Sequence, residues 1–364
     1  MEMKNLNCPL DYAKATVATM MRKYAAEDLP PKTGFHYHQG VFLDGVLRNY
    51  RFTKDESWFA YAKAWVDYML DEDGNVKYLF RDRPDDMQPG NLLYPLYERT
   101  GEQKYKNLMD FIMNRYLNYP KNKAGGYWHT EKRENEMWLD SLYMGGPIIC
   151  KYAKMFDRPE YYDIPATQAL LMQQMTLDKE TGLMYHAYDE DRKRPWADPE
   201  TGLAPEFWGR SIGWVPVAIM EELDYIPQDH PKYEALCDMV RNLLISLCKF
   251  QSEEGRWYQV VNKGYMPDNW LENSCSCLYI AALCAAVRKG ILDKSYLENA
   301  KKGYQGVINS LTWEGDDIQI GQVCIGTGVG NYEHYIKRPV CTNDLHGVGA
   351  FLIMCAEMQA VWEE

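Results

Sequence analysis

The chain is built from a repeated pair of helical segments, and this repeat constrains the fold more than any single motif does. A turn, charged residues and then an aromatic residue open the first helix of a pair, as in KDESWFAYAKAW and LDKSYLENAKKG. The second helix is richer in small and apolar residues, as in CLYIAALCAAV and HGVGAFLIMCA. A helix that is apolar on most faces is buried, whereas a helix with one apolar face lies outside it. The repeat therefore predicts an inner and an outer ring of helices.

Helix start and stop signals place these pairs along the chain. The predicted pairs are 9–24 with 38–51, 55–70 with 88–99, 103–118 with 138–155, 159–175 with 207–224, 230–250 with 271–288, and 294–310 with 343–360. There is almost no sustained strand pattern, although MYHAYD and RWYQVV can form short extended pieces. Six hairpins that close on themselves form an all-α (α/α)6 barrel, so we expect residues 1–364 to form a single domain of this architecture.

The connections between the predicted helices differ in length. Links from an inner to the next outer helix are short, whereas the links within a pair are long: about 25–37, 71–87, 119–137, 176–206, 251–270 and 311–342. All links of one kind lie at the same end of an alternating barrel, and long loops usually carry function. Most tryptophans and six of the seven histidines belong to the long-loop end; only His230 belongs to the other. A mouth rich in aromatic and imidazole rings is typical of a sugar site.

The charge and the N-terminal sequence exclude several classes of partner. The formal net charge of −12 argues against nucleic acid, which requires a basic face. The first helix has no apolar run of signal-peptide length, and no segment approaches the roughly 20 apolar residues of a membrane span. The ten cysteines lie mostly inside helical patterns and form no CxxC pair, so we expect reduced thiols and a cytoplasmic protein. No cluster of metal ligands is evident in the sequence, and no cofactor is expected.

An acid opens the third predicted inner helix in the stretch MWLDSLYMGGP. One reading of Asp140 is a carboxylate that the helix dipole stabilises at a helix N-terminus. The other reading is a general acid, because Trp138 flanks it and Gly145 and Gly146 permit close backbone approach one turn further on. An acid walled by apolar groups has a raised pKa, which suits proton donation. We favour the second reading.

Other polar residues open the remaining inner helices at the predicted mouth. In FWGRSIGW, Arg210 and Trp214 share a helix face; the arginine can be structural, or it can bind a carboxylate between Trp208 and Trp214. His186 in LMYHAYDED can be structural or functional. In RPDDMQPGN, one of Asp85 and Asp86 can cap the helix, while the other serves the site. The glycine-rich GQVCIGTGVGNYEHY lacks the strand-to-helix context of a phosphate loop, so we interpret it as a lid.

Together these stretches resemble glycoside hydrolase family 105, the unsaturated rhamnogalacturonyl hydrolases. The resemblance rests mainly on WLDSLYMGGP and FWGRSIGW, with HYHQGVFLDGVLR, DDMQPGNLLYPLYERTG, WLENS and the C-terminal CIGTGVGNYEHYIKRPVCTNDLHGVGAFLI in support. It implies an (α/α)6 barrel that removes a 4-deoxy-4,5-unsaturated uronic acid by hydrating its C4=C5 double bond, without a metal. It implies that Asp140 is the acid–base residue. The substrate-binding residues that we predict are His38, Asp85, His129, His186, Trp208, Arg210 and Trp214.

One departure from the family pattern concerns substrate charge. After His129 the resemblance suggests a lysine, whereas this chain has Thr130, with Lys132 two residues further on. Alternatives are an unsaturated glucuronyl hydrolase acting on glycosaminoglycan fragments, a hydrolase that uses Asp85 and Asp140 as two carboxylates, and a non-catalytic sugar-binding barrel. We expect an unsaturated oligosaccharide substrate, no nucleic acid, no membrane, and a monomer or weak homo-oligomer.

Overall fold

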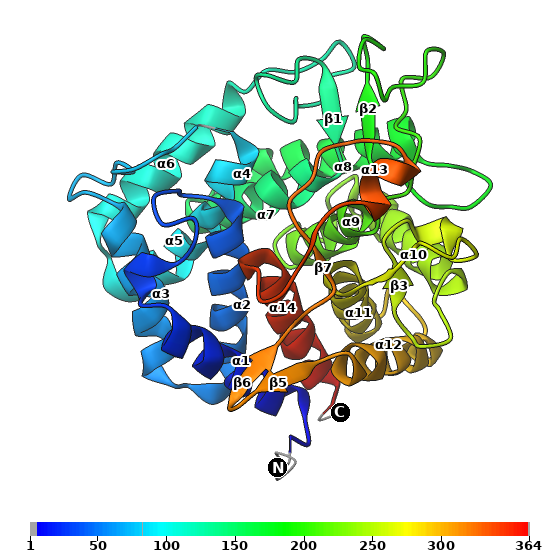
Figure 1. Ribbon diagram of the computed structural model, residues 1–364. Coiled ribbons are helices and arrows are strands. Elements are labelled where there is room, and N and C mark those ends of the chain that lie inside the picture. Colours follow the sequence, from blue (N-terminus) through cyan, green and yellow to red (C-terminus); the bar gives the residue numbers. More distant parts are fainter. Residues whose placement is uncertain (1–5, 82, 363–364) are drawn as a thin grey trace.

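The inner helices of the computed structural model, which describes residues 6–81 and 83–362, form a closed ring (Figure 1). They are α2 (Tyr37–Thr53), α5 (Leu93–Thr100), α7 (Asp140–Met155), α9 (Gly209–Glu222), α11 (Asn273–Arg288) and α14 (Leu345–Trp362). Each contacts the next, with the 3-10 turn η2 (Gln88–Leu92) leading into α5, and α14 returns to α2. The predicted (α/α)6 barrel is confirmed.

The outer helices lie against this ring. They are α1 (Pro9–Lys23), α3 (Glu56–Met69), α6 (Gln103–Leu117), α8 (Asp163–Thr176), α10 (Tyr233–Lys249) and α12 (Leu297–Asn309). Each pairs with an inner helix, as the hairpin pattern predicts. The largest departure lies in the second inner helix, predicted over 88–99. Its first turn is a 3-10 turn, because Pro89 has no backbone N–H and Gly90 is pressed against Ile112.

Small residues bring the inner helices close together. A Cβ added to Gly145 would lie 2.8 Å from Tyr116 Oη, and one added to Gly146 would meet the Glu222 carboxylate. We expected these glycines to permit close backbone approach, and they do so toward neighbouring helices, because Gly145 faces α6 and Gly146 faces α9.

The last inner helix, α14, is long and apolar enough to cross a membrane by length and composition. The sequence reading of membrane spans missed it. However, 83% of the helix is buried inside the barrel, where it contacts α2, α11 and α1. Its apolar character is therefore that of a core helix.

The long connections at the mouth carry short elements that fix their course. Antiparallel pairs join β1 (Glu136–Trp138) to β2 (Ala187–Asp189), β3 (Trp257–Tyr258) to β4 (Leu271–Glu272), β5 (Thr312–Glu314) to β6 (Asp317–Gln319), and β7 (Val323–Cys324) to β8 (Val340–Cys341). The helices α4 (Pro84–Met87) and α13 (Tyr332–Ile336), with the 3-10 turns η1 (Ala26–Asp28) and η4 (Val261–Lys263), also lie in these connections. The sequence pointed to β2 and β3, whereas the remaining strands are too short to leave a periodic signal.

Candidate active site

The pairing of β1 with β2 places Asp140 beside His186. Trp138 lies opposite Ala187 in this pair, and the Leu139 N–H donates to the His186 carbonyl at 3.1 Å. The next residue, Asp140, begins α7, and its Oδ2 lies 3.1 Å from His186 Nε2. Two residues far apart in the sequence therefore meet at the mouth because their connections form one small sheet.

A tyrosine lies on the other side of His186 and, together with Asp140, determines its tautomer. The Tyr335 hydroxyl lies 2.6 Å from His186 Nδ1 and accepts a hydrogen bond from the Gly330 N–H at 3.1 Å. Because an ionised carboxylate only accepts, Nε2 of the neutral imidazole carries the proton toward Asp140. Nδ1 then accepts from the Tyr335 hydroxyl. The segment that we interpreted as a lid thus contributes a buried tyrosine to the site.

This arrangement corrects one expectation about Asp140. Burial raises the pKa of Asp140, as we predicted, but the hydrogen bond from His186 and the electrostatic attraction of His186, His129 and Arg210 outweigh it. The pKa of Asp140 is therefore lowered from its ordinary value. In the substrate-free protein this side chain is therefore an ionised carboxylate and not a protonated carboxyl group.

One wall of the site is a stack of flat groups. The rings of His129 and Trp138 lie parallel, with centroids 4.0 Å apart and an interplanar angle of 4°. The Arg133 guanidinium lies 4.5 Å from the Trp138 ring centre, so the cation at this wall is Arg133, one residue beyond Lys132. Burial, together with the charge of Arg133, lowers the pKa of His129 to about 3, against the attraction of Asp140. His129 is consequently neutral, and its Nδ1 lies 2.9 Å from Ser141 Oγ.

The neighbouring acids Asp85 and Asp86 have different roles. Asp86 is buried and accepts from the Arg81 N–H at 2.8 Å and from Arg83 Nε at 3.2 Å, which makes it a structural residue. The Asp85 side chain is 16% exposed, and its only short ion pair among the described residues is with Arg83 at 3.8 Å. Burial raises the pKa of Asp85 to about 6; Arg83 opposes this, and Asp140 adds to it. Asp85 is thus the acid that is available to the site.

The three site residues predicted from FWGRSIGW have different neighbours in the structure. Trp208 lies over His186, with ring centroids 4.7 Å apart, and its Nε1–H donates to Gln259 Oε1 at 3.1 Å. Arg210 is 1% exposed, and it donates to the carbonyls of Cys324 at 2.6 Å and Ile325 at 2.9 Å. Its guanidinium therefore holds the segment 320–344 in place. Trp214 lies deeper and stacks on Tyr143, with centroids 4.7 Å apart.

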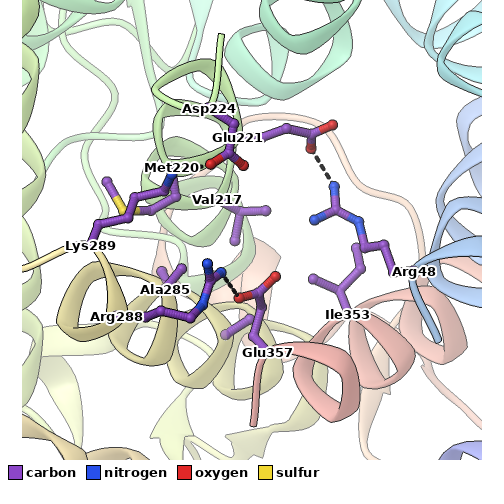
Figure 2. Close-up of a pocket in the computed structure, with 12 residues that line it drawn as sticks. Arg48, Val217, Met220, Glu221, Asp224, Ala285, Arg288, Lys289, Ile353 and Glu357 are labelled. Atoms are coloured by element: carbon purple, nitrogen blue, oxygen red, sulfur yellow. Dashed lines mark hydrogen bonds and ion pairs between the residues drawn. The ribbon is translucent and has the colours of Figure 1, made fainter. Parts of the chain in front are cut away.

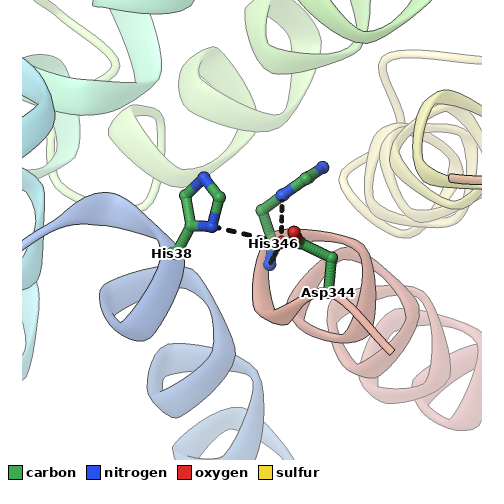
Figure 3. A group of neighbouring side chains, drawn as sticks. All are labelled: His38, Asp344 and His346. Carbon is green, nitrogen blue, oxygen red and sulfur yellow. Dashed lines mark hydrogen bonds and ion pairs between the residues drawn. The ribbon is translucent and has the colours of Figure 1, made fainter. Parts of the chain in front are cut away.

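The remaining predicted residue, His38, belongs to a cluster that sequence reading missed. His38 Nδ1 lies 3.1 Å, and His346 Nδ1 lies 2.6 Å, from Oδ1 of Asp344 (Figure 3). We expected no cluster of metal ligands, whereas the fold brings together three groups of the kind that bind cations. The sequence could not show this, because His38 and Asp344 come from opposite ends of the chain.

Sequence analysis also missed the tyrosines of the site. Tyr37 lies between the two histidines of HYHQG and interacts electrostatically with the charged residues of the site. Burial raises the pKa of Tyr37 above its usual range; Arg210 opposes this, and Asp85, Asp344 and Asp140 add to it. Tyr335 stood within the expected lid. Nothing in the local sequence marks either tyrosine, since each acquires its role from partners in other hairpins.

A small cavity lies at the short-loop end of the barrel, opposite the mouth (Figure 2). The Arg48 guanidinium bonds to Glu221, and Arg288 bonds to Glu357 at 2.5 Å. These residues stand near the C-terminal ends of inner helices, whereas Asp140 stands at an N-terminal end. The cavity measures only about 20 Å³, roughly room for one water molecule, so this end is a structural ion-pair network.

Comparisons with known proteins agree with this geometry. The sequence profile described as Glycosyl Hydrolase Family 88 matches residues 12–361. The unsaturated rhamnogalacturonyl hydrolase YesR of Bacillus subtilis is 25% identical over 329 residues, which cover 88% of each chain. A family 105 glycoside hydrolase structure from C. acetobutylicum superposes with a TM-score of 0.91 and 31% identity, covering 96% of this chain and 99% of that one. The unsaturated glucuronyl hydrolase of Bacillus sp. GL1 shares the fold at a TM-score of 0.68 and 15% identity, covering 95% of each chain.

Proposed function

The chain belongs to glycosyl hydrolase family 88 and to the family 105 enzymes, and from this membership we propose that it removes a 4-deoxy-4,5-unsaturated uronic acid from the non-reducing end of an oligosaccharide. The observation that carries the proposal is the hydrogen bond between His186 Nε2 and Asp140 Oδ2 at the long-loop mouth. It holds one carboxylate beside a wall of aromatic rings, and a second acid, Asp85, lies close enough to influence it.

The proposed reaction is hydration of an enol ether. A proton is added to C4 of the unsaturated sugar, and the positive charge that develops at C5 is shared with the ring oxygen. Water then adds its oxygen to C5 and releases a proton, which forms a hemiketal. The hemiketal opens to a ketone at C5, and the hemiacetal left at C1 breaks down and releases the rest of the oligosaccharide. One carboxyl group can donate the first proton and accept the second.

Asp140 is assigned this acid–base role. Its lowered pKa means that it must gain a proton as the substrate binds. An anionic uronate that replaces water beside Asp140 opposes the ionised form of its side chain and so raises its pKa. His186, which remains hydrogen-bonded to Tyr335, orients the carboxylate toward the reacting carbon and stabilises it whenever it is ionised.

Several residues around Asp140 bind and position the sugar in this proposal. The parallel rings of His129 and Trp138 limit the space beside Asp140, and Trp208 closes the side next to His186. Asp85 in its protonated form donates a hydrogen bond without repelling the uronate. The nearest cation at this wall, Arg133, lies 4.5 Å from the ring centre of Trp138 and supplies positive charge where the family pattern has a lysine.

We propose unsaturated rhamnogalacturonan disaccharides, which pectin-type lyases generate, as the substrate class. Support comes from the full-length similarity to YesR, which is named an unsaturated rhamnogalacturonyl hydrolase. The test is to incubate the protein with an unsaturated rhamnogalacturonyl disaccharide, an unsaturated glucuronyl disaccharide and a saturated galacturonide, and to quantify the released sugars. We expect turnover of the first at least about tenfold above the second, and none of the third. Preference for the unsaturated glucuronyl disaccharide would indicate a different substrate class. Cleavage of the saturated galacturonide would refute the hydration mechanism.

We also propose that the protein is cytoplasmic and is a monomer or a weak homo-oligomer. All ten cysteines are free thiols in the structure, and most are buried in helices, which suits a reducing compartment. Cell fractionation and light scattering on the purified protein test the two parts of this proposal. Recovery from the medium, or a stable dimer at micromolar concentration, would contradict it.

A further inference from the structure

A pair of histidines and one carboxylate meet where the first and last inner helices begin. His38 stands in the first turn of α2, Asp344 immediately precedes α14, and His346 stands in the first turn of α14 (Figure 3). The candidate ligand atoms of the three residues all lie within 4.8 Å of one another. The contact between α2 and α14 that closes the barrel thus brings both ends of the chain into this cluster.

The hydrogen bond on the far side of His346 determines which nitrogen is protonated. His346 Nε2 lies 3.0 Å from the Cys324 carbonyl oxygen, which only accepts, so Nε2 carries a proton. In the neutral imidazole, Nδ1 then carries no proton, and its lone pair faces Asp344; the distance from Nδ1 to Asp344 Oδ1 is 2.6 Å. His346 is fully buried, and its Nδ1 has no hydrogen-bond partner among the described residues. Two acceptors held this close require a cation between them. A metal ion can serve as this cation, because it forms bonds to the Nδ1 lone pair, the carboxylate and the second imidazole together.

We propose that His38, Asp344 and His346 bind a divalent transition-metal ion of the zinc class. Neutral imidazole and carboxylate are the ligands that such ions prefer, and three protein ligands leave at least one coordination position open. Two of the three ligands, His38 and Asp344, line a cavity of about 620 Å³ that also contains Arg81, Arg83 and Thr342. The open position faces this cavity, where water or an anionic oxygen of a ligand can complete the coordination.

The cluster contains neither member of the proton-transfer pair, and the proposal does not depend on the proposed reaction. It is linked to that pair through Tyr37, which interacts with both Asp344 and Asp140, and through Asp85, whose pKa His38 influences. His36 lies beside the cluster but outside it, because its Nε2 is 3.1 Å from Arg83 Nη2. His230 offers a matched control, since it pairs with Asp163 at 3.9 Å at the short-loop end.

The test uses full-length protein purified without a histidine tag and stripped with a chelator. Zinc chloride is titrated into wild type, His38→Gln, Asp344→Asn and His230→Gln by calorimetry, and cobalt(II) absorption reports the ligand geometry. We expect wild type and His230→Gln to bind one ion per chain, and both cluster variants to bind at least about 100-fold more weakly. His38→Gln is the informative variant if Asp344→Asn fails to fold, because the His38 side chain is 20% exposed.

Absence of saturable zinc binding by wild type, or equal binding by all four proteins, would overturn the proposal. In that case nitrogen NMR should show His346 as an imidazolium paired with Asp344. Turnover of the unsaturated disaccharide by the stripped protein is measured in parallel. Zinc binding without turnover would contradict only the proposed function, and turnover without zinc binding would contradict only the metal site.

Discussion

The Tyr335 hydroxyl lies 2.6 Å from Nδ1 of His186, the histidine that hydrogen-bonds Asp140 through its other nitrogen. This contact joins α13, in the last long connection, to the acid that opens α7. Because Tyr335 accepts from the Gly330 N–H, its single proton is directed to His186. The tautomer of His186, and with it the orientation of Asp140, therefore depends on a residue that we do not expect to touch the sugar.

Tyr335→Phe tests this positioning role. We expect kcat to fall about 10- to 100-fold with little change in KM, because His186 loses the donor that fixes its tautomer. Nitrogen NMR of His186 should show the Nε2–H form in wild type and a mixture of tautomers in the variant. Tyr265→Phe is the control, since Tyr265 is 78% exposed. An unchanged tautomer with lowered kcat would assign Tyr335 a different role.

The raised pKa of Asp85 predicts a pH dependence of activity. With a pKa of about 6, Asp85 is largely protonated below pH 6 and ionised above it. An ionised Asp85 repels the anionic substrate, so kcat/KM should fall as the pH rises through about 6. The side chain of Asp85→Asn is neutral at every pH, so kcat/KM of this variant should not fall through pH 6, whatever its absolute value. The same fall in both proteins would show that another group titrates there.

Arg210 should act through the segment 320–344. Arg210→Lys cannot donate to the carbonyls of Cys324 and Ile325 in the same geometry, because lysine lacks the planar fork of donors. We expect faster amide hydrogen exchange in residues 320–344 and a loss of activity of about tenfold or more. Arg241→Lys, at the short-loop end, also loses a bond to a backbone carbonyl and should leave this exchange unchanged. Normal exchange with lost activity would favour direct substrate binding by Arg210.

Glu222 should make the protein less stable as the pH rises. Burial, with the charge of Glu221 next, raises the pKa of Glu222 from 4.5 to about 8. Between these values the folded chain holds a proton that the unfolded chain has lost, so the free energy of unfolding falls with rising pH. Relative to wild type, Glu222→Gln should gain about 2–4 kcal/mol of stability between pH 5 and pH 9.

The neighbouring Glu221 offers a control of opposite sign. Although burial raises its pKa, Arg48 and Lys151 lower it to about 2, so its stabilising contribution is present above pH 4.5 and is lost as the pH falls toward 2. Glu221→Gln should therefore destabilise the protein at pH 7, and less so near pH 3. Urea unfolding across pH measures both variants. Parallel pH curves for wild type and Glu222→Gln would contradict the raised pKa of Glu222.

The barrel could be predicted from the sequence because its cause is local and repeated. An inner helix such as α11 is apolar on nearly every face, so the hydrophobic pattern assigns it to the inner ring. The loop lengths alternate, so they indicate which end of the barrel is the mouth. The position of Asp140 at the mouth was predictable because it begins an inner helix. Where a residue such as Pro89 interrupts the helical pattern, the predicted start of the helix was less accurate.

The partners of the site residues could not be predicted, because they come from other hairpins. Arg210 binds carbonyls more than a hundred residues away in the sequence, and His186 meets Tyr335 across a similar separation. The predicted direction of the Asp140 pKa shift was wrong for the same reason, since the hydrogen bond from His186 and the attraction of other distant residues outweigh the effect of burial. The cluster of His38 with Asp344 exists only because the barrel closes.

The most direct test of hydration uses a substrate whose aglycone bond cannot break. In an unsaturated uronide with a methylene group in place of the glycosidic oxygen, the C4=C5 bond can still be protonated and hydrated. We expect wild type to abolish the ultraviolet absorbance of the conjugated double bond in this analogue, while Asp140→Asn, folded to the same extent by circular dichroism, leaves it intact. A wild-type protein that cleaves the natural disaccharide but leaves the analogue's absorbance unchanged would show attack at C1 and contradict hydration.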